Sequence, residues 1–205
     1  HRQKKQYGPS NTDQPRVKPM ITISFFFWTL VALFAIIGSM RGWAKEILVT
    51  FSLVMALFVM QVALTHVGPI KKLWEAMGGS TQFYAASLVM ILFALFGYHT
   101  PNAQKVNKNL ARDNKSAARH WLQDMMLGGI LGAGNGYLLV GTIWFFLDLA
   151  KYPVPEYILT APEKGTAVGE AALKLIHWLP PVWLEVPIIY FVVAVVFTFV
   201  IIVLI

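Results

Sequence analysis

Cysteine is absent from the 205 residues, and charged residues are scarce at 13% of the chain. The lack of thiols excludes disulfides, thiolate metal sites and cysteine nucleophiles from this sequence. A soluble domain carries charge on about a quarter of its residues, so this chain has too little polar surface to cover a globule in water. Hydrophobic residues make up 57% of it. The composition therefore predicts an integral membrane protein whose first partner is the lipid bilayer.

The positive net charge of +7 does not indicate a nucleic-acid partner. The basic residues are spread between apolar blocks, an arrangement that in membrane proteins matches loops facing anionic lipid headgroups. No folded soluble domain is left to carry a surface that could read nucleic acid. We therefore expect no nucleic acid among the partners.

Patterns that would indicate catalysis or metal binding are also missing. The five histidines include no pair four residues apart, so we predict no metal site. No nucleophile and base stand in a recognisable pattern, so we name no catalytic residue and expect no enzyme. His66 and His99 fall near the ends of apolar runs, where either could serve as a ligand to a haem or pigment. We favour histidines without a ligand there and predict no cofactor.

Long apolar runs dominate the rest of the sequence. About 20 apolar residues in a helix cross a hydrocarbon core of about 30 Å. The backbone of each run must close its own hydrogen bonds in lipid, which a helix permits. We therefore expect an all-α, polytopic transmembrane helical bundle. Its four core spans and a fifth, C-terminal span are expected at residues 21–40, 47–67, 82–98, 126–149 and 186–205.

The apolar runs divide the chain into four segments. We expect a basic flexible tail at 1–19, a four-span core at 20–150, an interfacial connector at 151–185 and the fifth transmembrane helix at 186–205. An amphipathic pattern over 164–179 predicts a helix lying in the membrane interface. The basic stretch 102–124 fits a surface helix or a solvated loop equally well. Lysine and arginine favour an N-terminus on the inner side, by a small excess.

Glycine recurs every four residues in the fourth span. Gly128, Gly132 and Gly136 form one strip, and Asn135 lies beside it. Without side chains, such a strip lets a neighbouring backbone approach closely, which is how helices associate in lipid. We expect these four residues to pack helices and Asn135 to make an interhelical hydrogen bond. The favoured neighbour lies within the chain, while another subunit or a second copy in a homo-oligomer stays open.

Few polar groups fall within or between the first spans. Arg41, Gly42 and Glu46 form the hairpin turn, where a local ion pair that anchors topology is favoured over a gate or docking point. Inside the spans the polar residues are Gln61, Asn135 and, near one edge, Asp148. Ionisable groups within a membrane often mark ion or proton paths, so Asp148 is the acidic candidate.

The hairpin and the fourth span resemble the colicin V production protein (CvpA) family over roughly residues 21–150. That family has an Arg-Gly-aromatic-x-x-Glu turn, which here runs from Arg41 to Glu46. It also has an Asp followed by Leu-Gly-x-x-x-Gly-x-x-x-Gly, here Asp124, Leu127 and the three glycines, and residues 145–148 match a Phe-Phe-Leu-Asp ending. The resemblance implies a protein of the bacterial inner (cytoplasmic) membrane, associated by name with toxin production or export.

These observations favour one function and leave two alternatives open. We expect a non-enzymatic accessory subunit that packs against other membrane protein subunits and stabilises a larger complex. A component of a transport or toxin-export system is the second hypothesis, with Asp148, Asn135 and Arg41 lining a path. A pigment or haem protein using His66 or His99 is a distant third.

Overall fold

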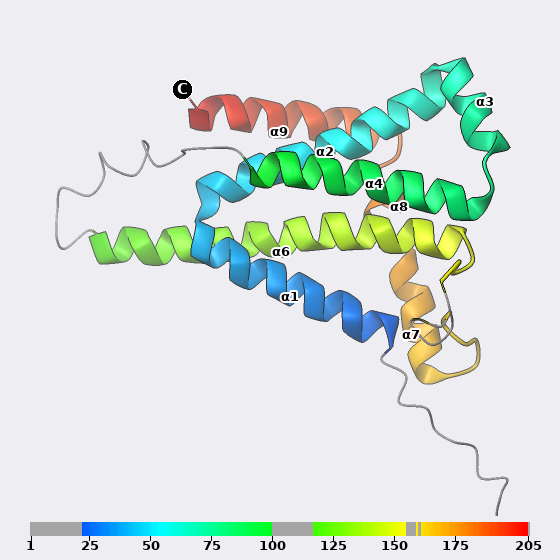
Figure 1. The fold of residues 1–205 in the computed structure, drawn as a ribbon. Coiled ribbons are helices and arrows are strands. Elements are labelled where there is room, and N and C mark those ends of the chain that lie inside the picture. The colour runs from blue at the N-terminus through cyan, green and yellow to red at the C-terminus, as the bar shows by residue number, and fades with distance from the viewer. Residues whose placement is uncertain (1–21, 100–116, 155–158, 160, 205) are drawn as a thin grey trace, which may run out of the picture.

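The regular structure of the described chain is entirely helical, as expected (Figure 1). The computed structural model describes residues 22–99, 117–154, 159 and 161–204. The predicted tail at 1–19 and residues 102–116 of the basic stretch lie outside the described residues.

Four helices are long and apolar enough to cross a membrane, which confirms the four core spans. These are α1 (Ile23–Arg41), α2 (Trp43–His66), α4 (Gly79–Tyr98) and α6 (Ala117–Leu149). Helix α3 (Gly68–Ala76) connects α2 to α4, with a proline in its first turn, where the missing amide proton costs no helical hydrogen bond.

Two helices begin earlier in the chain than the spans expected from the sequence. Helix α2 begins four residues early, so Glu46 lies in its first turn and not in a linking turn, because Gly42 alone reverses the chain. Helix α6 includes residues 117–124 of the basic stretch, so its 33 residues extend about 50 Å at about 1.5 Å per residue. That length exceeds a hydrocarbon core of about 30 Å. Its first turns extend past the α1–α2 turn (Figure 1).

The remaining helices are short. Helix α7 (Ala167–Ile176) lies crosswise to the long helices (Figure 1), α8 (Pro180–Trp183) follows it, and α9 (Ile188–Leu204) packs along α2. At 17 residues, α9 extends about 26 Å. It is apolar throughout, and its crossing of the membrane as a fifth span stays a prediction.

The amphipathic helix is shorter than the expected 164–179, and the bundle uses part of its apolar side. The Thr166 hydroxyl caps α7 by accepting from the Gly169 amide at 3.0 Å. Ala172 is buried against the bundle together with Leu179, whereas Val168 is exposed, contrary to its place in the apolar pattern. The position of α7 in a membrane interface stays a prediction.

Helix α6 is the centre of the fold. It packs most extensively against α1 on one side, and against α2 and α4 on the other. Helices α1 and α2 run in opposite directions but diverge from their shared turn (Figure 1), so they contact each other little. One apolar cluster joins α2, α4, α6 and α9, and a second joins α1, α6 and α7.

Candidate functional site

The turn between α1 and α2 is fixed by a carboxylate from a distant helix. Gly42 has φ +83°, a left-handed conformation that side chains rarely adopt. Asp124 of α6 accepts a hydrogen bond from the Trp43 amide at 3.0 Å, so it caps the exposed start of α2. A Cβ at Gly42 would lie 2.7 Å from Asp124 Oδ2. Position 42 therefore requires glycine for two reasons: its φ is positive, and a side chain there would collide with the capping Asp124.

Glu46 is fully buried one turn into α2. Arg41 Nη1 donates to Glu46 Oε1 at 2.7 Å, which forms the local ion pair expected at the hairpin. Asn135 of α6 donates to the other carboxylate oxygen, Glu46 Oε2, at 2.8 Å. Both oxygens of this buried acid are thus matched by donors from two different helices.

Asn135 is also fully buried, and each of its polar atoms is used. Its amide nitrogen donates to the Glu46 backbone oxygen at 3.0 Å as well as to the side chain. Its carbonyl oxygen accepts from the Thr50 hydroxyl at 2.7 Å. Asn135 therefore makes interhelical hydrogen bonds from α6 to α2, as the sequence predicts.

Arg41 extends the network to α4. Its guanidinium lies 4.3 Å from the centroid of the Tyr98 ring, and Nη2 is 3.4 Å from the Tyr98 backbone oxygen. Arginine is suited to this position because its planar group can pair with a carboxylate and stack on a ring. We call Arg41, Glu46, Thr50, Tyr98 and Asn135 the polar cluster. It joins four helices: α1, α2, α4 and α6.

The energetics of the polar cluster favour a structural role. Removing two charges from water costs desolvation free energy, unless a good pairing geometry and further hydrogen bonds compensate for that cost. Here they do, because Glu46 has two donors and Arg41 keeps a side-chain exposure of 23%. Because the buried side chains of Glu46 and Asn135 are fully hydrogen-bonded only when α1, α2 and α6 are placed as observed, they favour that one arrangement.

The glycine strip of α6 is occupied by α1. A Cβ at Gly132 would overlap the Phe34 backbone oxygen and lie 2.9 Å from Gly38 Cα. One at Gly128 would overlap the Gly38 backbone oxygen, and one at Gly136 would lie 2.8 Å from Phe34 Cβ. All three glycines therefore pack against α1 of the same chain, and not against another subunit.

Asp148 lies at the opposite end of α6, 13 positions from Asn135, or about 20 Å along the helix. The Tyr152 hydroxyl, just beyond α6, accepts from Trp144 Nε1 at 3.2 Å. Burial raises the pKa of Tyr152, and the neighbouring Asp148 carboxylate raises it further. Asp148 therefore belongs to a separate group and does not join Arg41 and Asn135.

The other candidates also lie apart. Gln61 is half-buried on α2. His66 ends α2 and His99 follows α4; both are exposed, and they lie at opposite ends of the bundle (Figure 1), so they could not share one cofactor. Among the described residues, no group of three or more His, Cys, Asp or Glu side chains could hold a metal ion.

Sequence reasoning missed three participants. Gly38 is four residues before Gly42, so α1 carries its own small-residue spacing that could have marked it as the partner of the strip. Thr50 is one helical turn after Glu46, on the same face of α2. Nothing in the sequence marks Tyr98, because its role depends on how α4 docks.

Four apolar helices joined by a buried polar cluster and a glycine contact define an integral membrane protein of the helical-bundle class. A family model described as "Colicin V production protein" matches residues 23–162. The match covers most of the chain, so the chain belongs to the colicin V production protein family. No curated protein and no solved structure matches it.

Proposed function

We propose that the chain is a non-enzymatic membrane subunit that packs against other membrane proteins and stabilises a larger complex linked to toxin production. The family description supports the link to a toxin. One observation carries the structural role: every side-chain polar atom of Asn135 and both carboxylate oxygens of Glu46 are hydrogen-bonded inside the chain. These hydrogen bonds hold a scaffold and leave neither carboxylate oxygen of Glu46 free for chemistry.

The outer face of α4 supports the packing role. Tyr84, Leu88, Leu92, Leu95 and Phe96 follow one another at helical spacing, and each is at least half exposed. Lipid covers a face of this kind when no protein does, so apolar character alone does not select between them. Whether lipid or another protein covers the outer face of α4 has to be determined by experiment.

Site-specific photo-crosslinking tests the packing role in the native membrane. A photoreactive residue at Leu92 should give a discrete adduct with one membrane protein, whereas the same residue at the fully buried Met90 should react only within the chain. Particles extracted with their lipid should be heavier than one chain plus lipid. Lipid adducts alone at Leu92, from particles with the mass of a single chain, would contradict the proposal.

We also propose an inner-membrane location with the N-terminus inside. The basic tail supports this orientation, because its lysines and arginines give the inner side the larger count. Because the chain has no cysteine, single cysteines at Lys71 and Lys45 can report the two ends of the bundle. Added to spheroplasts from the outside, an impermeant thiol reagent should reach Lys45→Cys and not Lys71→Cys; the opposite pattern would reverse the orientation.

A transport or toxin-export component is the second candidate, supported by the Arg41–Glu46 pair between apolar helices, since buried ionisable groups often mark ion paths. A path that also included Asp148 would extend about 20 Å along α6 from Asn135. Reconstituted vesicles should then show flux that Asp148→Asn or Glu46→Gln abolishes. Unchanged flux in both variants, or none with the wild type, would exclude it.

Haem or pigment binding through His66 or His99 stays a minor proposal. Both side chains are exposed, so either could meet a cofactor held mainly by another subunit. An absorbance spectrum of the complex purified in mild detergent tests this directly. A visible band lost in His66→Ala or His99→Ala would support it, and a spectrum without such a band would exclude it.

A further inference from the structure

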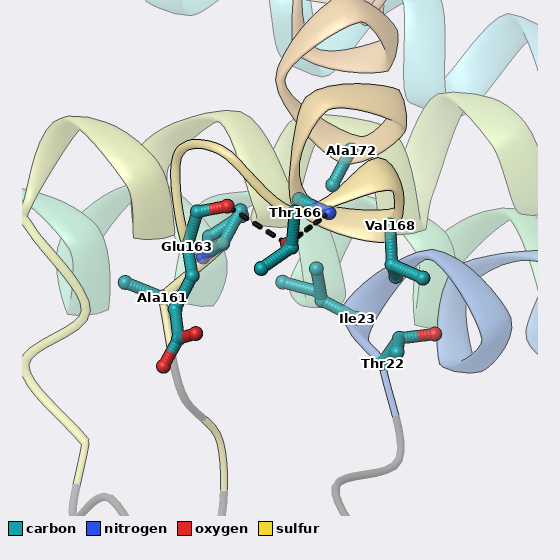
Figure 2. A pocket seen from close by; sticks show the side chains of 9 residues that line it. Thr22, Ile23, Ala161, Glu163, Thr166, Val168 and Ala172 are labelled. Carbon is teal, nitrogen blue, oxygen red and sulfur yellow. Dashed lines mark hydrogen bonds between the residues drawn. The ribbon is translucent and has the colours of Figure 1, made fainter.

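Two adjoining cavities lie where α1 begins. The first, of about 190 Å³, is lined by the start of α1 and by residues 161–172 of the connector and α7 (Figure 2). The second, of about 70 Å³, lies between α1 and the last third of α6. Ile23 lines both, so the two cavities adjoin at its side chain. We call the two together the α1–α7 groove.

The two halves of the α1–α7 groove differ in chemistry. The inner half is lined only by apolar side chains, among them Phe26, Val140 and Ile143, and Phe26 is half exposed at its edge. The outer half carries the Thr22 hydroxyl and the exposed Glu163 carboxylate. In Figure 2 Thr22 and Glu163 lie on opposite sides of the Ile23 side chain.

The direction of this change matches the depth of a bilayer. Thr22 directly precedes the apolar α1, and Ile23 lines the same cavity as Leu147, close to the end of α6, so this end of the bundle lies at headgroup level. Phe26 is four residues further into α1, about 6 Å deeper. The polar half of the groove thus lies at headgroup depth and the apolar half at acyl-chain depth.

We propose that the α1–α7 groove binds one phospholipid with a zwitterionic headgroup that carries a primary ammonium. Its acyl chain lies between α1 and α6, as a continuation of the lipid-facing surface that Phe26 opens onto. The Thr22 hydroxyl accepts from the Phe25 amide at 3.4 Å, which leaves its own proton to donate to a lipid phosphate. Glu163 forms no ion pair with any described residue, so its carboxylate matches the ammonium.

Charge complementarity selects this headgroup over an anionic one. A purely anionic lipid would place a second negative charge beside Glu163, and like charges in contact disfavour binding. The proposal is independent of the protein-packing role, because the groove is on the α1 side and the crosslinking face is on α4.

A lipid carrying a photoreactive acyl chain tests the proposal on the full-length protein in nanodiscs. With a phosphatidylethanolamine probe, labelling should concentrate on residues 22–27 and 140–147, well above labelling of the exposed α4 face. A phosphatidylglycerol probe should label the groove less. Equal labelling of the groove and the α4 face, or equal labelling by the two probes, would overturn the proposal.

Two variants separate the halves of the groove. Glu163→Gln removes an exposed charge, so it should leave the fold intact and reduce the preference between the two probes by about two- to fivefold, the range of an exposed ion pair. Val140→Trp should reduce groove labelling by either probe, with Leu92→Trp on α4 as the matched control. An unchanged preference in Glu163→Gln would refute the role of the carboxylate.

Discussion

Replacing Gly132 by alanine is expected to destabilise the bundle. The added Cβ would overlap the Phe34 backbone oxygen and lie 2.9 Å from Gly38 Cα, closer than a real Cβ is found. Both obstacles are backbone atoms of α1, so no side-chain rotation relieves them and the two helices must move apart. Overpacking of this kind costs about 1–3 kcal/mol, which should appear as a lower free energy of unfolding.

The same helix supplies a matched control. A Cβ at Gly134 would meet nothing within 4 Å. Alanine there gains helix propensity of up to about 1 kcal/mol relative to glycine, so Gly134→Ala should be neutral or stabilising. The two single-methyl variants, two residues apart, should therefore differ by about 1–4 kcal/mol.

Unfolding in mixed detergent micelles, followed by circular dichroism, measures this difference. A second assay reports the helix contact itself, because a Cβ at Gly129 would lie 3.5 Å from Ser39 Cβ, within disulfide range. Cysteines at 39 and 129 should crosslink readily alone and with Gly134→Ala, and slowly with Gly132→Ala. Equal stability and equal crosslinking of the two variants would refute the close approach of α1 and α6.

Four further outcomes are expected. Asn135→Ala should lower the free energy of unfolding by about 1–3 kcal/mol, because it leaves the buried Glu46 carboxylate a donor short; an unchanged value would contradict the network. Removing Arg41 or Glu46 alone should cost about 3–5 kcal/mol, and removing both should cost less than the sum; additive costs in a double-mutant cycle would show no coupling. Asp124→Ala should cost about 0.5–2 kcal/mol through loss of the α2 cap, and no loss would exclude that role. Since the folded-state pKa of Tyr152 is above its ordinary value of 10.0, stability should fall as pH rises above 10, and Tyr152→Phe should flatten this fall in alkaline unfolding curves.

The polar cluster argues against the path through the membrane that the sequence suggested. Arg41 and Asn135 were candidates to line one with Asp148, yet the first two meet through Glu46 whereas Asp148 lies at the far end of α6. The cluster is formed from groups that neutralise one another. The first experiments should therefore measure how Asn135, Arg41 and Glu46 contribute to the free energy of unfolding, and whether Arg41 and Glu46 are energetically coupled.

The sequence by itself determined the features that depend on local composition. Apolar runs of about 20 residues must be helices in lipid, so the sequence alone predicted the four core spans. Gly42 marked the reversal between α1 and α2, and the four-residue glycine spacing marked a face of α6 for close contact. Each of these signals lies within one segment, where periodicity and backbone chemistry are enough.

Only the tertiary structure decided which segments meet. The sequence could not show that α1, rather than another subunit, occupies the glycine strip, because that depends on Gly38 and the crossing of two helices far apart in the chain. Nor could it pair Glu46 with Asn135, which are 89 residues apart. Interhelical hydrogen bonds and close backbone contacts depend on docking geometry, and docking follows from the packing of all the helices together.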